Sequence, residues 1–180
     1  KAGSYESGTV VDSYGGGICQ VSTTLYLAVM RSELQIDRRS NHSMLVSYVK
    51  PSMDAAIAEG IKDFIFTNNT DAPVYIEGTA DGWEVAFTIY GKDTRADNRE
   101  VRFVSETLSN DDPEVELKAK LWKIITIDGE ETKIEFNHST YYKKKEEKIE
   151  DPEGTGEYSE ESQSSDDDYD EDYDEDYDED

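Results

Sequence analysis

One segment near the N-terminus has the apolar spacing of a helix. In residues 19–32, apolar side chains recur three or four positions apart, and further apolar residues occupy the opposite side. A helix that is apolar nearly all round is covered on several faces, so the pattern predicts a buried helix. Residues 1–17 are rich in Gly, Ser and Tyr and predict a loop or an irregular strand.

After the helix, the pattern changes to short β-rich runs separated by turn residues. Asp81-Gly82 is a strong two-residue hairpin signal. The residues after it alternate apolar and polar side chains, which is typical of a strand with two unlike faces. Residues 54–59 are expected to form a short turn of helix. Strands are expected over residues 44–49, 61–66, 74–77 and 83–90.

A second group of strands surrounds a chain break at residues 110–113. Residues 115–127 alternate apolar and charged side chains, turn at Asp128-Gly129 and return over 132–136, which predicts a β-hairpin. Residues 99–108 predict one more strand. The expected fold class is α+β, with a buried N-terminal helix packed on a mostly antiparallel sheet and a C-terminal β-hairpin.

The net charge of −25 is concentrated at the C-terminus. Residues 151–180 contain 17 acidic residues and no Lys or Arg, so residues 1–150 carry only −8. Dense like charge with almost no aliphatic residues predicts a disordered tail. Residues 1–150 are mildly acidic and therefore lack the positive charge with which proteins bind nucleic acid or an anionic membrane surface. The expected divisions are an α+β domain over 1–98, a hairpin extension over 99–145 and a disordered acidic tail over 146–180.

The single cysteine, Cys19, follows Gly15-Gly16-Gly17 and stands in the first turn of the expected helix. Unpaired amides and the positive end of the helix dipole stabilise a thiolate there, and the thiolate is the nucleophilic form. Glycines let a substrate backbone approach closely. The amides around Cys19 and the side chain of Gln20 are candidates for holding an oxyanion. The alternative is a buried cysteine that only fills space.

A cysteine nucleophile needs a base, and the base needs a partner that orients it. His42 precedes an expected strand, whereas His138 lies late in the chain, so His42 is the better candidate base. Asp63 interrupts the apolar run 61–66 and is the candidate orienting carboxylate. The order Cys, His, Asp is that of papain-like and transglutaminase-like cysteine enzymes. A surface histidine and an outward Asp on an edge strand are the alternatives.

Other sites and the compartment are less well defined by the sequence. Two histidines and one cysteine lack metal-ligand spacing, so no metal and no cofactor is expected. Asn68-Asn69-Thr70 matches a glycosylation acceptor but also fits turn chemistry. One cysteine allows no internal disulfide, and no apolar run reaches the length of a membrane span. The chain opens with Lys1-Ala2-Gly3 rather than Met, so it reads as a fragment or a processed chain.

The glycine-rich run around Cys19 resembles the signature of the VanW family, bacterial proteins named from a vancomycin-resistance cluster. That run is Gly15-Gly16-Gly17-Ile18-Cys19-Gln20-Val21-Ser22-Thr23-Thr24-Leu25-Tyr26. The likeness covers about residues 1–90 and includes Asn41-His42-Ser43, Val46-Ser47-Tyr48-Val49, Asp54-Ala55, Lys62-Asp63-Phe64, Asn68-Asn69-Thr70 and Pro73-Val74-Tyr75-Ile76. The hairpin over 121–136 also looks like the segment that often closes clostridial-type members.

The resemblance implies an extracytoplasmic protein of a Gram-positive-type cell, linked to the cell envelope and tethered by an N-terminal membrane segment. Cys19, His42 and Asp63 fall on positions that match the family motif. Members often carry Asn at the position of Leu27, and Pro-Gly-Arg-Asp where this chain has Pro51-Ser52-Met53-Asp54. The absence of that Arg removes an anion clamp.

Two functions compete at this point. In the first, Cys19, His42 and Asp63 catalyse acyl transfer or hydrolysis at peptide or amide bonds of the cell wall. The residues expected around the substrate are Gly16, Gly17, Gln20, Ser22 and Thr23, the last two capping or lining the helix start. In the second, Cys19 only packs, and a non-catalytic module binds a wall polymer or a surface protein through Tyr5, Tyr14, Trp83 and Tyr90. A third idea makes the acidic tail an electrostatic spacer or a cation-dependent docking strip.

Overall fold

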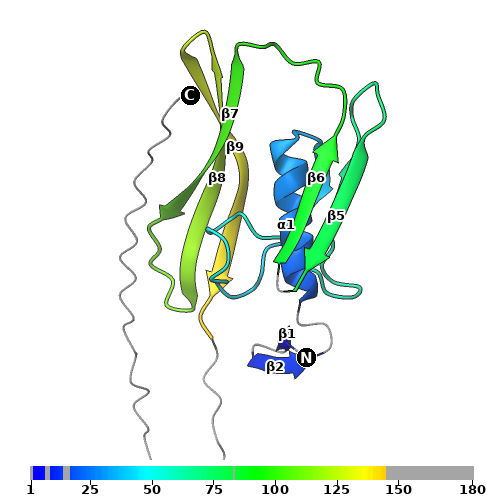
Figure 1. The fold of residues 1–180 in the computed structure, drawn as a ribbon. Coiled ribbons are helices and arrows are strands. Elements are labelled where there is room, and N and C mark those ends of the chain that lie inside the picture. The colour runs from blue at the N-terminus through cyan, green and yellow to red at the C-terminus, as the bar shows by residue number, and fades with distance from the viewer. Residues whose placement is uncertain (1, 7–8, 14–16, 83, 145–180) are drawn as a thin grey trace, which may run out of the picture. The chain divides into compact units, whose positions relative to one another are not determined.

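The computed structural model describes residues 2–6, 9–13, 17–82 and 84–144, and it describes side chains from residue 17 onward. The described residues all belong to one unit of the chain (Figure 1). The acidic tail that the sequence predicts to be disordered lies outside the described residues. Among the helices of the described ranges, none is long and apolar enough to cross a membrane.

The predicted helix is present as α1, Ile18–Arg31. Its buried side carries Ser22, Thr23, Tyr26, Val29 and Met30. The sequence predicts a helix that is buried nearly all round, but the buried face of α1 covers only part of its circumference. The side chains of Ile18 and Val21 are 53% and 39% exposed. The helix ends in a Schellman motif, in which the Glu33 and Leu34 amides donate to the carbonyls of Met30 and Val29.

The rest of the described fold consists of antiparallel strands. They form three two-stranded sheets and one three-stranded sheet with the order β7-β8-β9. The strands are β1 (Ala2–Glu6), β2 (Thr9–Ser13), β3 (Gln35–Arg38), β4 (Ile65–Thr67), β5 (Tyr75–Asp81), β6 (Glu84–Tyr90), β7 (Arg99–Leu108), β8 (Val115–Ile127) and β9 (Glu130–Tyr142). The molecule is therefore mostly β, with one N-terminal helix packed on antiparallel sheets, as expected in outline.

Both hairpins that the sequence marks with Asp-Gly are confirmed. Gly82 has a φ of +61° between β5 and β6, and Asp128 and Gly129 have φ of +52° and +83° between β8 and β9. Left-handed backbone at these positions turns the chain in the sense that matches strand twist. Two-residue turns of this kind are local, so sequence alone predicts them.

The segment between β3 and β4 differs from the prediction. Residues 44–49 form no strand, and residues 54–57 form no helical turn. In the second expected strand, Ile65 and Phe66 pair with β3, and Lys62 forms an isolated bridge with Ala58. In residues 54–57, contacts with other segments satisfy backbone groups that a helical turn would pair. The Ala55 amide, for example, donates to Thr23 Oγ1 at 3.0 Å, and the Ala56 amide donates to the Ser40 carbonyl at 2.8 Å.

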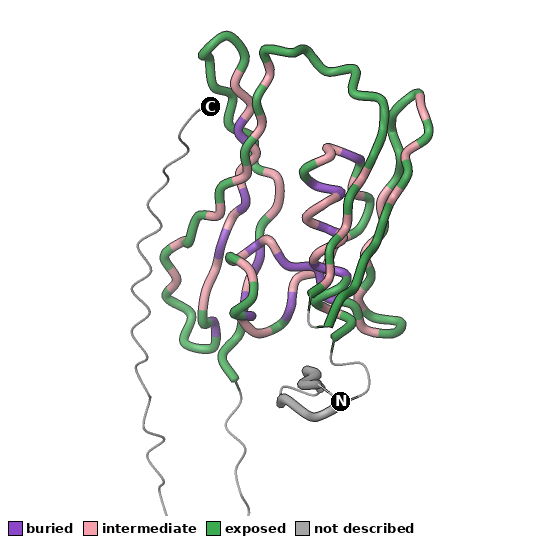
Figure 2. Tube along the Cα trace, in the orientation of Figure 1, coloured by how far each residue is buried: buried purple, intermediate pink, exposed green. Residues whose placement is uncertain are grey.

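The hydrophobic core joins this buried loop to α1 and the three-stranded sheet. Its centre consists of Tyr26, Met30, Ala55 and Leu121. Figure 2 shows buried positions on α1, on the loop and on the strands of the large sheet. The partly buried side chains packed around this centre are Leu27, Ile36, Met53, Phe64, Phe103 and Phe136. The core therefore fixes α1 relative to a loop that lies further along the chain.

Candidate active site

The Cys19 thiol lies at the N-terminal end of α1 and is partly exposed. Its Sγ is 3.6 Å from the carbonyl oxygen of Ile57, and the thiol shares a hydrogen bond with the imidazole of His42. That hydrogen bond is the largest influence on the thiol and lowers its pKa; burial opposes the effect, and the positive charges of His42 and Lys62 add to it. The nucleophilic thiolate is therefore favoured at a lower pH than in a free cysteine.

The imidazole of His42 is buried and is held by Asp54. Its Nδ1 lies 2.7 Å from Oδ2 of Asp54, and the backbone N–H of His42 donates to the same oxygen at 2.6 Å. Nδ1 is thus engaged with Asp54. The other ring nitrogen, Nε2, lies 3.4 Å from the Tyr48 hydroxyl. Burial by itself lowers the pKa of His42, but the hydrogen bonds to Asp54 and Cys19 outweigh burial and raise the pKa.

The two opposite shifts favour an ion pair. A lowered thiol pKa and a raised imidazole pKa widen the pH range in which thiolate and imidazolium coexist. Such a pair combines a nucleophile with a proton donor in one hydrogen-bonded unit, which is what acyl transfer by cysteine requires.

Asp54 is the fully buried centre of this arrangement. Its Oδ1 accepts hydrogen bonds from Arg39 Nη2 at 2.7 Å and from the Tyr141 hydroxyl at 2.6 Å, while Oδ2 accepts both bonds from His42. Burial raises the pKa of Asp54, but its bonds to His42, Arg39 and Tyr141 outweigh burial and hold the pKa at about 2. The carboxylate therefore stays ionised and keeps its orientation, and it fixes the tautomer of His42.

Hydroxyl groups on α1 hold the Asp54 loop against the start of the helix. Ser22 Oγ donates to the carbonyl of Ala55, and Thr23 Oγ1 accepts the Ala55 amide at 3.0 Å. Both side chains are buried. They therefore set the distance between the helix that carries Cys19 and the loop that carries Asp54.

The start of α1 offers amides to an anion. The helix is capped at Gly17, and within the described part of the chain no side chain caps the first turn. The first N–H groups of a helix have no intrahelical partner, so those of Cys19 and Gln20 are donors next to the thiol. The oxyanion site that the sequence predicts at these amides stays a prediction.

One more cation lies near the thiol. Lys62 Nζ donates to the Asn41 carbonyl at 2.7 Å and to Ser43 Oγ at 3.1 Å. Burial lowers the pKa of Lys62, although the charges of Asp54 and Cys19 oppose that effect. The positive charge of its ammonium helps to lower the pKa of Cys19. Its hydrogen bonds also connect the turn at 58–62 to the loop that carries His42.

Asp63 does not have the place that the sequence predicts for it. Its side chain is exposed and accepts the amide of Phe64 at 2.8 Å, whereas Asp54 hydrogen-bonds the imidazole of His42. The physical reason is that residues 58–62 form a turn rather than a strand, so no pleat directs Asp63 inward. His138, the other histidine, lies on β9 with its side chain 78% exposed, whereas His42 is buried.

The remaining predicted residues divide into two groups. Gly17 and Gln20 are exposed at the helix start, whereas Ser22 and Thr23 have their hydroxyls engaged by Ala55. Gly16 and the side chains of Tyr5, Tyr14 and Trp83 lie outside the described residues. In the ranges 17–82 and 84–144, no group of three or more His, Cys, Asp or Glu is placed to hold a metal ion.

Comparison with known proteins places these residues in a family. Residues 1–90, half of the chain, match the family described as VanW like protein. This chain belongs to the VanW-like family. It is 42% identical over 86 residues to the uncharacterized protein YoaR of Bacillus subtilis (strain 168), a match that covers 48% of this chain and 28% of YoaR. No solved structure matches the chain.

The site of this VanW-like domain includes a residue that sequence reasoning passed over. Asp54 ends the segment Pro51-Ser52-Met53-Asp54. Ser52 has a φ of +66°, a left-handed conformation that favours glycine. Its amide donates to the Tyr141 hydroxyl at 2.7 Å and its Oγ donates to the Ala119 carbonyl at 3.1 Å. The motif match was the available signal that this turn presents a carboxylate.

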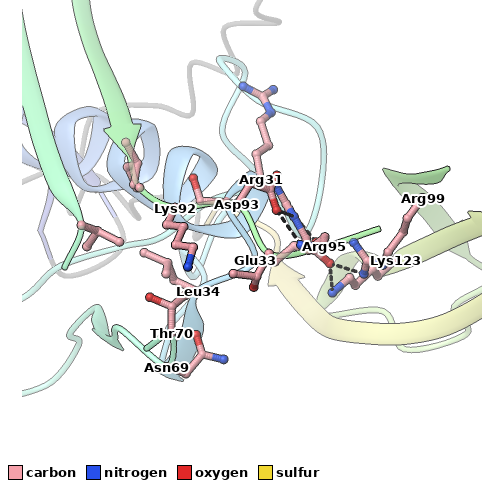
Figure 3. A pocket seen from close by; sticks show the side chains of 15 residues that line it. Arg31, Glu33, Leu34, Asn69, Thr70, Lys92, Asp93, Arg95, Arg99 and Lys123 are labelled. Carbon is pink, nitrogen blue, oxygen red and sulfur yellow. Dashed lines mark hydrogen bonds and ion pairs between the residues drawn. The ribbon is translucent and has the colours of Figure 1, made fainter. Parts of the chain in front are cut away.

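A second polar cluster lies at the opposite end of α1 (Figure 3). Glu33 has a φ of +59°, and its largely buried carboxylate pairs with Arg95, Arg99 and Lys123. The hydrogen bond from Arg99 is the largest influence on Glu33; burial opposes it, and Lys123 and Arg95 add to it, so the pKa of Glu33 lies below its usual range. The cluster joins the end of α1 to β7 and β8, which is a structural role.

Glu33→Gln is expected to lower the free energy of unfolding by about 1–3 kcal/mol at pH 7, because three cations lose a partly buried partner. The folded-state pKa of Glu33 is depressed, so its contribution is complete above the unfolded value of about 4.3 and is lost as the pH falls through the folded value. Urea unfolding at pH 7 and pH 3 measures this. The difference between wild type and variant should shrink at pH 3, and the exposed Glu131→Gln should leave stability nearly unchanged at both.

Proposed function

We propose that this domain catalyses cysteine-dependent acyl transfer or hydrolysis at peptide or amide bonds of the cell wall. The observation that carries the proposal is the hydrogen-bonded series from the Cys19 thiol through His42 to the buried carboxylate of Asp54. A merely space-filling cysteine needs neither the histidine nor a buried, ionised carboxylate behind it, and burying that carboxylate without a use for it is costly.

In the first step, Sγ of the Cys19 thiolate attacks the carbonyl carbon of the amide. A carbon–sulfur bond forms and the carbonyl electron pair moves to oxygen, where the amides at the start of α1 receive the negative charge. His42 then gives its Nε2 proton to the leaving nitrogen as the carbon–nitrogen bond breaks. The products of this step are a thioester on Cys19 and a free amine.

In the second step, the thioester transfers its acyl group. Water or an acceptor amine gives a proton to Nε2 of His42 as it attacks the thioester carbon, and the thiolate of Cys19 leaves. Asp54 keeps Nδ1 protonated through both steps and so acts as a positioning residue. A water acceptor makes the reaction a hydrolysis, and an amine acceptor makes it a transfer that forms a new amide.

The proposed chemistry is supported by the order of residues in the chain, and the proposed location in the cell envelope is supported by the family. The chain order of a helix-borne Cys followed by His is that of papain-like and transglutaminase-like enzymes, and we extend that layout to this domain. The envelope substrate and the extracytoplasmic location rest on the VanW-like family and its association with vancomycin resistance. A wall polymer or wall peptide is accordingly the proposed partner.

The pH dependence of Cys19 alkylation tests the chemistry without a known substrate. Iodoacetamide is expected to alkylate the folded wild type well below pH 8.5, the pKa of a free thiol. His42→Ala removes the largest cause of the lowered thiol pKa. At pH 6.5 that variant is expected to react at least about tenfold more slowly, because a free thiol is only about 1% ionised there.

The exposed histidine provides the matched control. His138→Ala should leave the alkylation profile unchanged, because His138 has no role in the series. Alkylation that begins only when the protein unfolds would make Cys19 a structural residue. That outcome would favour the non-catalytic module that binds wall polymers. The described candidates for its binding face are the exposed rings of Tyr75 and Tyr90, which are tilted by 31° with centroids 6.0 Å apart.

A further inference from the structure

An apolar groove runs along the exposed side of α1. It has a volume of about 630 Å³ and lies between the helix, the loop at 48–49 and strand β6. We call it the aliphatic groove and define it by Ile18, Val21, Thr24, Leu27, Tyr48 and Val85. Although 34% of the chain is charged, none of the described residues that line this groove carries a charge.

The groove approaches the reacting atoms through Tyr48, and neither Cys19 nor His42 is among the described residues that line it. Ile18 and Gln20, the chain neighbours of Cys19, both line it. Tyr48 lines it as well, and its hydroxyl lies 3.4 Å from Nε2 of His42, the nitrogen that handles the proton. A molecule in the groove therefore contacts Tyr48, on the Nε2 side of His42.

Several apolar side chains at the groove are partly exposed. The side chains of Ile18, Val21 and Tyr48 are 53%, 39% and 38% exposed. Ile57 and Ile61, which follow Asp54, are 38% and 73% exposed, and the Ile57 carbonyl contacts the thiol. Adjacent exposed aliphatic residues around a nucleophile are typical of a surface that a ligand covers.

We propose that the aliphatic groove binds an uncharged aliphatic portion of the acyl donor, next to the carbonyl that Cys19 attacks. This inference rests on the proposed function, and it specifies the donor: small uncharged side chains are accepted there and charged ones are rejected. A charge placed against this lining would lose its hydration without gaining a partner. Each methylene fully buried in the groove would instead favour binding about fourfold.

The test uses N-alkylmaleimides with ethyl, butyl and hexyl chains as probes of Cys19, on the full chain. Each rate is divided by the rate with iodoacetamide, which has no alkyl chain, and compared with the same ratio for glutathione. The hexyl reagent is expected to gain at least about tenfold over the ethyl reagent on the protein, because the groove buries part of four methylenes. Glutathione, which has no groove, should show no such gain.

Two variants locate the effect. Val21→Lys is expected to remove most of the gain with the hexyl chain, because it places an ammonium in the groove. Ile134→Lys makes a comparable change at a 46% exposed aliphatic residue on β9, outside the groove, and should keep the full gain. Circular dichroism checks that both variants are folded, and a third variant, Leu27→Asp, repeats the test if Val21→Lys is unfolded.

The outcomes separate this inference from the proposed function. If the wild-type ratio equals that of glutathione, or if Val21→Lys keeps the gain, the groove does not bind the donor and the inference is overturned. A dimer in solution that Val21→Lys dissociates, without any chain-length dependence, would overturn it too by identifying a second copy as the occupant. The proposed function fails on a different result, an iodoacetamide profile that His42→Ala does not shift.

Discussion

Cys19→Ala is expected to reduce acyl transfer by at least about a thousandfold while leaving the stability of the fold close to that of wild type. The loss follows from removal of the only atom that can form the thioester, and amides at the helix start and substrate binding retain only a residual rate. Stability is preserved because the thiol is partly exposed and lies at the end of α1, outside the core centred on Tyr26 and Leu121.

The measurement is intact-protein mass spectrometry after mixing with purified peptidoglycan fragments, together with urea unfolding of both proteins. Wild type should gain the mass of an acyl group, and Cys19→Ala should gain none. Cys19→Ser keeps a nucleophilic atom at the same place and should accumulate a longer-lived ester in small yield. An alanine variant that transfers acyl groups as well as wild type would place the nucleophile elsewhere, and one that unfolds would make Cys19 structural.

Asp54→Asn is expected to produce the largest loss of stability, about 3–5 kcal/mol. The substitution removes a fully buried negative charge and leaves the guanidinium of Arg39 without its carboxylate. The Tyr141 hydroxyl and the His42 imidazole also lose a charged acceptor. Since this free energy is a large part of the stability of an ordinary domain, the midpoint of urea unfolding should fall markedly at pH 7.

The pH dependence of that loss has a defined sign. The pKa of Asp54 is depressed to about 2 from about 3.9, so its contribution is complete above pH 4 and is lost as the pH falls toward 2. The difference between wild type and Asp54→Asn should therefore shrink below pH 4. In addition, the alkylation profile of Cys19 should move to higher pH, which a purely structural role of Asp54 does not require.

Asp63→Asn is the matched control for this prediction. Asp63 is exposed and contacts the Phe64 amide, so the variant should resemble wild type in both unfolding and alkylation. The reverse result, with Asp63→Asn shifting the alkylation profile and Asp54→Asn leaving it unchanged, would restore the assignment made from the sequence pattern.

The comparison of Asp54 with Asp63 shows where sequence reasoning reaches its limit in this protein. Both carboxylates lie in runs that resemble the family, and Asp63 was preferred because it interrupts an expected apolar strand. The choice depended on the conformation of residues 58–66, which is a turn followed by a short strand. That conformation is not set by local propensity, because contacts with α1 and β9 satisfy the backbone of the preceding loop.

Elements whose conformation depends on local preferences agree with the prediction. Alternation in β6 and β8, the two Asp-Gly turns and the helix at 18–31 all follow from preferences within a few residues. β3 was missed because Gln35–Arg38 is short and polar and is a strand only through its pairing with β4. The exposed side of α1 was expected to be buried, because apolar residues that line a groove look the same in a sequence as core residues.

The sequence by itself indicated that a cysteine stands at the N-terminus of a helix, that His42 is the better candidate base of the two histidines, and that residues 1–90 resemble a known family. These conclusions depend on residue types and short spacings, which remain meaningful without coordinates. The tertiary structure decided that Asp54, not Asp63, hydrogen-bonds His42 and that the exposed side of α1 forms a groove lined by Tyr48. Both depend on residues distant in the chain, including Tyr141, whose approach is set by core packing and by the register of β9.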